Sequence, residues 1–163
     1  MAETLRPCLT FKDRAEEAVK FYVSIFPNSK ITDISRVETD GGPIPKGKLL
    51  SAIFKLDGRE FRAFDGGESF SFSEGISLDV TCKNQEEVDR YWSKLTSGGG
   101  EEGPCGWLKD RFGLSWQVVP EQLGQMLSDP KGGNSEAAMN AMLKMKKIDI
   151  ATLEKAYKGS PVA

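Results

Sequence analysis

The stretch CGWLKDRFGLSWQVVP, residues 105–120, decides the fold of this chain. Its pattern predicts two short strands, 106–109 and 114–119, joined by a tight turn over residues 110–113. The two faces of this hairpin and its match to an earlier segment decide how the rest of the chain is interpreted.

The two faces of the second strand differ in character. Because successive strand side chains point to opposite faces, Trp116 and Val118 share one face, and Ser115, Gln117 and Val119 share the other. An aromatic residue beside a β-branched residue indicates a core face. An amide in the middle of the opposite face indicates the floor of a binding site.

The first and second parts of the chain repeat each other. The segment EEAVKFYVSI, residues 16–25, aligns with EEVDRYWSKL, residues 86–95. The segment GREFRAF, residues 58–64, likewise aligns with GLSWQVV, residues 113–119. Each half therefore predicts a strand, a helix and up to three further strands, written βαβββ. Neither half can close its sheet alone, so the two sheets are expected to pair into a cup with the helices outside.

The predicted fold class is α+β, with paired βαβββ modules forming a cup-shaped sheet and a C-terminal helical tail. The modules are expected over residues 6–66 and 75–120 and the tail over residues 121–159, in one compact domain overall. The remaining expected strands are 6–12, 29–39, 48–56, 59–65 and 76–82, and the expected helices are 15–26, 85–95, 120–129, 135–147 and 150–158. Asp13, with Glu16 as its capping-box partner, is expected to cap the first helix, and Asn84 the second.

The composition excludes several classes of partner. The chain has 163 residues and a formal net charge of −2, which gives no electrostatic basis for binding nucleic acid or an anionic membrane. No apolar run approaches the ~20 residues of a membrane helix, and MAETLRPCLTF lacks the features of a secretion signal. Three cysteines without a CxxC pair indicate a reduced, cytoplasmic setting. The absence of histidine removes the commonest metal ligand and general base.

The repeat, the GWLKDRFGLSWQVVP segment and the ending AMLKMKKIDIATLEKAYKG resemble the PhnB-like branch of the vicinal oxygen chelate superfamily. That superfamily includes glyoxalase I, extradiol dioxygenases and bleomycin-resistance proteins, and the resemblance runs from Pro7 to Gly159. It implies paired βαβββ modules and a homodimer. The branch often carries a 3-demethylubiquinone-9 3-methyltransferase label. However, a methyl donor typically needs a glycine-rich loop between a strand and a helix, whereas Gly98–Gly100 follows a helix, so methyltransferase activity is not expected.

The resemblance also implies where a metal would bind. In metal-dependent relatives His and Glu ligands occupy positions that correspond to Arg6, Arg62, Gly75 and Gln117, and none of these is a usual ligand. We therefore expect no metal and no cofactor. Asp65 or Asp79 could rebuild a metal site only if the strand registers were shifted.

Strand parity selects the residues that would face a ligand in the cup. Gln117 either bonds to a neighbouring strand side chain or orients a ligand. For Arg62, an ion pair with Glu60 or Asp79 is favoured over a grip on a carboxylate or phosphate. Cys8 and Cys105 are expected to be small buried thiols, and Cys82 to be core. The expected ligand-binding residues are Cys8, Thr10, Arg62, Phe64, Ser77, Asp79, Trp107 and Gln117.

Three functions follow from this reading. The first is binding of a small molecule in the cup without a metal, in a protein of the glyoxalase-like fold. The second is a metal-dependent lyase, isomerase or dioxygenase with a displaced ligand set. The third is a structural or regulatory dimer whose cup is filled by its own side chains. The first is the prediction that we carry forward.

Overall fold

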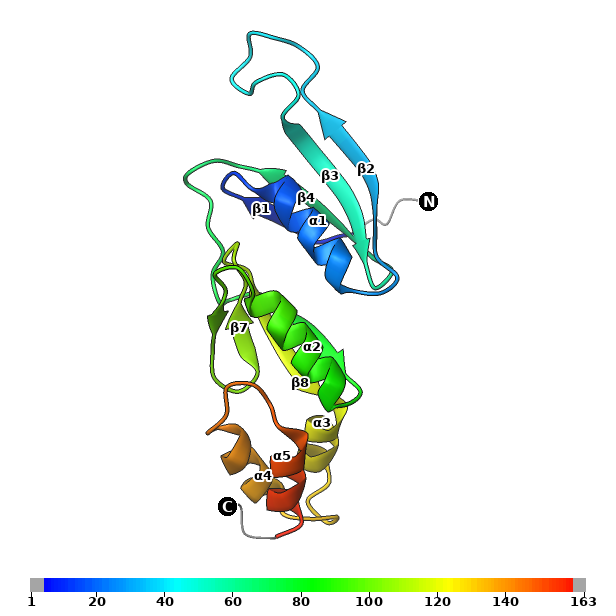
Figure 1. The fold of residues 1–163 in the computed structure, drawn as a ribbon, viewed down its shortest axis with the longest axis vertical. Coiled ribbons are helices and arrows are strands. Elements are labelled where there is room, and N and C mark those ends of the chain that lie inside the picture. The colour runs from blue at the N-terminus through cyan, green and yellow to red at the C-terminus, as the bar shows by residue number, and fades with distance from the viewer. Residues whose placement is uncertain (1–4, 160–163) are drawn as a thin grey trace. The chain divides into compact units, whose positions relative to one another are not determined.

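The computed structural model describes residues 5–159. The chain divides into two compact units, Met1–Phe72 and Ser73–Ala163, and each is described by itself. Each unit contains a four-stranded sheet with one helix packed on it, and the second unit also carries the C-terminal helices (Figure 1).

The first unit has the order β1 (Cys8–Phe11), α1 (Ala15–Ile25), β2 (Lys30–Arg36), β3 (Leu49–Leu56) and β4 (Arg59–Asp65). The strands lie in the order β1-β4-β3-β2, with β1 parallel to β4 and the other pairs antiparallel. This is the predicted βαβββ order. The parallel pair requires the long connection through α1, β2 and β3, because a short turn can join only antiparallel neighbours.

Helix α1 covers one face of this sheet. Its apolar stripe includes Ala18 and Tyr22, which are buried against Leu9 and Phe11 of β1 and against β3 and β4. The β3–β4 turn uses Asp57 and Gly58 with φ of 47° and 78°. Positive values at both positions are what a two-residue hairpin turn requires, so the expected strands 48–56 and 59–65 are joined by a tight hairpin at Asp57-Gly58.

The start of α1 differs from the sequence prediction. Its N-cap residue is Arg14, which makes no side-chain capping bond, and Asp13 plays no part. Instead, the Asp65 carboxylate of β4 accepts a 2.7 Å hydrogen bond from the Ala15 backbone N–H. A group distant in sequence thus provides the acceptor that a capping residue normally provides.

The second unit repeats the first, with β5 (Ser77–Cys82), α2 (Gln85–Thr96), β6 (Glu101–Glu102), β7 (Trp107–Lys109) and β8 (Ser115–Pro120). Its strand order is β5-β8-β7-β6, with β5 parallel to β8. Only β6 was not predicted, because two glutamates after a glycine turn carry no strand pattern. Helix α2 is capped as predicted, since the Asn84 side chain accepts a bond from the Glu87 N–H.

The turn between β7 and β8 depends on Asp110, which is 3% exposed. Its Oδ1 accepts bonds from the backbone N–H groups of Phe112 and Leu114, and its Oδ2 accepts a 2.8 Å bond from Trp116 Nε1. These bonds satisfy a buried carboxylate and hold the core indole in place. The core role predicted for Trp116 and Val118 is confirmed, as both are at most 2% exposed.

The C-terminal tail forms three short helices, α3 (Glu121–Ser128), α4 (Ser135–Met142) and α5 (Ile150–Tyr157). They enclose a small core of their own: Leu123, Met126, Ala138, Ile148 and Leu153. Helix α4 ends earlier than predicted, because the carbonyls of Met145 and Lys146 accept bonds from the backbone N–H groups of Cys105 and Gly106.

The α+β class, the two βαβββ modules and the helical tail are therefore confirmed. The pairing of the sheets into a cup and the division at 6–66, 75–120 and 121–159 stay predictions. No helix among the described residues is long and apolar enough to cross a membrane.

Candidate functional site

Four of the predicted site residues share one face of the first sheet. Cys8 lies opposite Arg62 and Thr10 opposite Phe64 in the β1–β4 register, while Leu9, between Cys8 and Thr10, is buried on the α1 side. Cys8 and Arg62 are exposed, and Thr10 and Phe64 are half-buried. The sheet therefore brings these four side chains together on the face that α1 does not cover.

Arg62 does not form the ion pair with Glu60 that was expected. Glu60 pairs with Arg6 instead. The Arg62 guanidinium lies over the Phe64 ring, 5.8 Å from its centroid, and no carboxylate of the described first unit pairs with it. A cation over an aromatic face contributes only about 0.5–1 kcal/mol at an exposed site, so the guanidinium donors remain available to a ligand.

Phe70 lies at this face, although it was not among the predicted site residues. Gly66 approaches Thr10 and Phe70 so closely that a Cβ there would lie 2.6 Å from Thr10 Cγ2 and 2.5 Å from Phe70 Cδ2. Phe70, which is 46% exposed, therefore lies beside Thr10 at the edge of the face. The Gly66-Gly67 pair before a phenylalanine is the sequence signal that could have indicated this close approach.

The other four predicted residues share one face of the second sheet. Asp79, Gln117 and Trp107 are direct cross-strand neighbours on β5, β8 and β7, and Ser77 lies two residues before Asp79, on the same face of β5. Leu108, beside Trp107, is buried on the α2 side. This register shows which face of the sheet Trp107 is on, a point that the sequence left open because the strand is short. All four side chains are on the face that α2 does not cover.

Gln117 bonds to a neighbouring strand, as one of its two predicted roles required. Its Nε2 donates a 2.9 Å hydrogen bond to Ser77 Oγ, and both residues are half-buried. The bond orients the amide and leaves Oε1 as an acceptor on the face. The two roles are therefore compatible, because a held amide is better placed to orient a ligand than a mobile one.

The three cysteines lie in different surroundings. Cys82 is buried on the α2 side as predicted, and burial raises the pKa of its thiol to about 12. Cys105 is half-buried, and Cys8 is exposed, so the expectation of a buried thiol is wrong for Cys8. Cys8 is therefore the thiol that a solvent-borne reagent can reach.

The residues present do not fit a divalent metal ion. Among residues 5–159 there is no group of three or more His, Cys, Asp and Glu side chains that could hold one. Asp65 lies beside Phe11 on the α1 side and bonds to Ala15, which removes it as a replacement ligand. Asp79 remains on the open face of its sheet, beside an amide and an indole rather than a second carboxylate.

A family model described as 3-demethylubiquinone-9 3-methyltransferase matches residues 3–119, ending before the C-terminal helices. The PhnB protein of Bacillus cereus is 35% identical over 72% of this chain and 99% of its own chain, with a TM-score of 0.65. The fosfomycin resistance protein FosX of Listeria monocytogenes is 18% identical over 78% of this chain and 98% of its own, with a TM-score of 0.56. A FosX crystal complexed with Mn(II) and sulfate is 19% identical over 71% and 90%, with a TM-score of 0.51. No curated protein matches the chain.

Proposed function

The chain belongs to the 3-demethylubiquinone-9 3-methyltransferase family, the PhnB-like branch of the vicinal oxygen chelate superfamily, and from this membership we propose that it binds a small organic molecule without a resident metal. The observation that carries the proposal is the composition of the open sheet faces. In each unit one helix covers one face, and the other face presents polar groups beside an aromatic ring. Binding sites commonly combine apolar surface with a few fixed polar groups.

The side chains on these faces offer binding groups rather than metal ligands. Arg62 and Thr10 offer hydrogen-bond donors to a ligand on the first face, and Gln117 is held by Ser77 on the second. A guanidinium would oppose a metal cation, and a neutral amide is a weak ligand. The FosX protein was crystallised with Mn(II) and sulfate. At 19% identity, however, its similarity to this chain concerns the fold alone.

The geometry gives no support to methyl transfer, despite the description of the family. The glycines Gly98–Gly100 lie between the end of α2 at Thr96 and the start of β6 at Glu101. A nucleotide-like methyl donor is typically held where a glycine loop leads from a strand into a helix N-terminus. Here the glycines terminate a helix, which is their ordinary structural use.

Two measurements test the proposal. Metal analysis of the protein, purified without an affinity tag, should find no divalent ion at stoichiometric amount; one ion per chain would favour the metal-dependent alternative. A thermal-shift screen of small organic molecules should raise the Tm for some compounds, since a ligand that binds only the native state stabilises it. No shift across a broad set would contradict binding and favour a purely structural protein.

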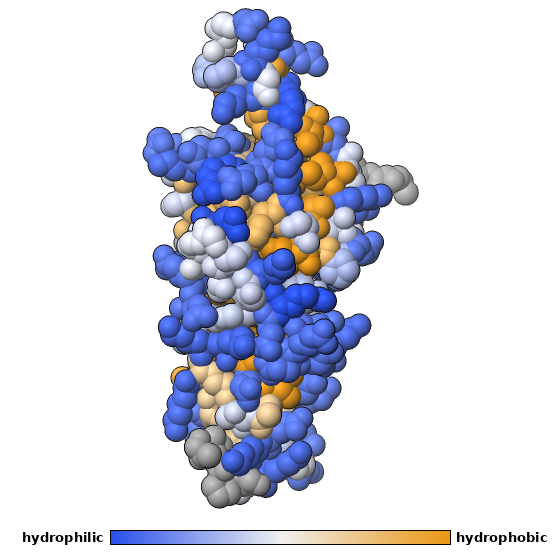
Figure 2. All heavy atoms as spheres, in the orientation of Figure 1, coloured by the Kyte–Doolittle hydropathy of each residue, from blue (hydrophilic) through white to orange (hydrophobic). Residues whose placement is uncertain are grey.

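We further propose that the protein is a cytoplasmic homodimer. Figure 2 shows apolar side chains on the part of the first unit where β2 and β3 lie. The exposed large apolar residues there are Ile34, Ile44 and Leu50, at 36%, 42% and 51% exposure. Exposed apolar patches often mark subunit contacts, and three unpaired thiols suit a reducing compartment.

A further inference from the structure

The row of side chains that crosses the open face of the second sheet points to a particular class of ligand. Trp107, Gln117 and Asp79 are consecutive neighbours on the adjacent strands β7, β8 and β5. Adjacent strands are ~4.8 Å apart, so the backbone positions of Trp107 and Asp79 are about 10 Å apart, with Gln117 between them. An ammonium group placed above Gln117 would therefore have the Trp107 strand on one side and the Asp79 strand on the other.

Each group in this row attracts a hydrogen-bond donor or a cation. One of the two Gln117 Nε2–H donors is used on Ser77 Oγ, which fixes the amide and leaves Oε1 as the acceptor for a ligand. Asp79 is exposed, and no ion pair joins it to a cation of the described second unit. The π face of an indole is the strongest aromatic partner for a cation.

A cationic side chain on the same face as the row is already neutralised. Lys109 shares the face, opposite Ser115, and forms an ion pair with Glu74. Its charge is therefore balanced locally, and Asp79 gives the row a net negative charge. A positively charged ligand would meet favourable electrostatics here, and an anionic ligand would meet Asp79 and the Gln117 carbonyl oxygen.

The backbone holds Trp107 in place. Its N–H donates to the Pro104 carbonyl, and its own carbonyl accepts a 2.8 Å bond from the Gly103 N–H. The preceding Gly106 donates to the Lys146 carbonyl of the C-terminal segment and accepts from the Val118 N–H. The indole is thus carried on a fixed strand, which lowers the entropy lost when a ligand binds.

We propose that the Trp107–Gln117–Asp79 row binds an organic cation, with an ammonium group between the Asp79 carboxylate and the indole ring and an N–H donated to Gln117 Oε1. This inference rests on the proposed small-molecule function and names the class of ligand for one of its two faces. The apolar part of such a ligand would lie against Trp107.

A matched set of benzylamine, benzyl alcohol and benzoate tests the proposal on the full-length protein, because the three share one ring and differ in charge. In an NMR titration, benzylamine should shift the Trp107 indole N–H and the backbone amides of Asp79 and Gln117, while benzoate leaves them unchanged. Asp79→Asn keeps the shape and removes the charge, so it should weaken benzylamine binding by about tenfold. Asp33→Asn, an exposed aspartate of the first unit, is the control and should change nothing.

The outcomes separate this inference from the proposed function. The cation assignment would be overturned if Asp79→Asn bound benzylamine as tightly as the wild type. It would also be overturned if benzoate or another compound without a positive charge bound this face instead of benzylamine. Either result would leave the proposed small-molecule binding intact. A protein that binds neither these probes nor any compound of the thermal-shift screen would overturn both.

Discussion

Asp65 caps α1 from a neighbouring strand, although Asp13 stands closest to the helix start in the sequence. The Asp65 carboxylate reaches the Ala15 N–H because β4 pairs with β1 and ends beside the beginning of the helix. The N–H of a buried first-turn residue needs a hydrogen-bond acceptor, and here a tertiary contact provides that acceptor.

We expect Asp65→Ala to lower the free energy of unfolding by about 1 kcal/mol, the usual value of a capping acceptor. Asp13→Ala is the matched control and should change stability by less than about 0.5 kcal/mol, as other exposed substitutions do. Urea denaturation of the two variants checks this, and a larger loss from Asp13→Ala would restore the capping box.

Glu16 makes the best-defined ion pairs on α1. It accepts bonds from Arg36 at 2.8 and 2.9 Å and from Lys20 at 2.8 Å. The hydrogen bonds from Arg36, and then from Lys20, lower the pKa of Glu16 to about 2. Both cations are largely solvent-exposed, which screens the interaction.

A lowered carboxyl pKa stabilises the folded state above the ordinary pKa of Glu, and the contribution is lost as the pH falls from about 4.5 towards 2. We expect Glu16→Gln to cost ~1 kcal/mol at neutral pH and almost nothing once the pH falls below the folded pKa of about 2. Denaturation curves over this pH range measure the difference. Glu86→Gln, at the equivalent position of the repeat, is the control; a pH-independent loss in Glu16→Gln would contradict the ion-pair explanation.

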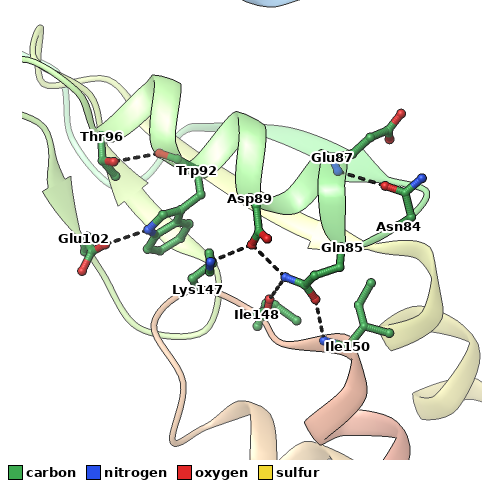
Figure 3. A network of polar contacts seen from close by, with 10 residues as sticks. All are labelled: Asn84, Gln85, Glu87, Asp89, Trp92, Thr96, Glu102, Lys147, Ile148 and Ile150. Carbon is green, nitrogen blue, oxygen red and sulfur yellow. Dashed lines mark hydrogen bonds and ion pairs between the residues drawn. The ribbon is translucent and has the colours of Figure 1, made fainter.

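At the scale of elements, α2 is tied to the C-terminal tail by a network of polar contacts (Figure 3). The Gln85 side chain donates to Asp89 Oδ1 and to the Ile148 carbonyl, and its Oε1 accepts a 2.8 Å bond from the Ile150 N–H at the start of α5. Lys147 pairs with Asp89 at 2.6 Å. One side chain therefore satisfies backbone groups of a segment more than 60 residues away.

We expect Gln85→Ala to reduce stability by about 1–3 kcal/mol, because it leaves a carbonyl and an N–H of the tail without their partner. Hydrogen exchange should accelerate first in α5 and the segment before it, since local opening needs fewer contacts to break than global unfolding. Gln125→Ala, on an exposed position of α3, is the control. Unchanged exchange in α5 would show that the apolar core of the tail holds it without Gln85.

The family model ends at residue 119, so this tail lies beyond the part of the chain that the model covers. Its attachment is nevertheless specific. The carbonyls of Met145 and Lys146 accept bonds of 2.8 and 2.7 Å from Cys105 and Gly106, directly before Trp107. The tail thus stabilises the beginning of the strand that carries a candidate site residue.

At the scale of the whole molecule, the exposed apolar side chains of β2, β3 and their connecting loop predict self-association. Sedimentation equilibrium should give twice the mass of the chain at micromolar concentration. Replacing both Ile34 and Leu50 with Ser should shift the protein towards monomer, while Met139→Ser and Leu143→Ser, exposed on the tail, should not. A wild-type monomer at high concentration would contradict the proposed homodimer.

The elements were predictable because their signals are local and periodic. Two-residue alternation located β5 and β8, the 3.6-residue stripe located α1, the repeat and the Asn84 cap located α2, and Asp57-Gly58 located a hairpin. The repeat converted these into two βαβββ modules. The site residues other than Trp107 could be assigned to a face for the same reason, since parity is read directly from alternation.

The partners of those residues were not predictable in the same way. Glu60 pairs with Arg6 rather than Arg62, and α4 stops early to let Met145 and Lys146 bond to residues 105–106. In each case several contacts between residues distant in sequence compete. A local sequence pattern does not show which of these contacts has the better geometry.

The stretch at residues 105–120 shows both sides of this division. Its sequence determined the hairpin, the buried Trp116 and the outward position of Gln117, because alternation and turn chemistry act over a few residues. Only the tertiary structure decided that Asp110 holds the Trp116 indole, that Ser77 orients Gln117, and that Asp79 completes the row with Trp107. These contacts depend on strand register, which long-range pairing sets and sequence periodicity alone does not.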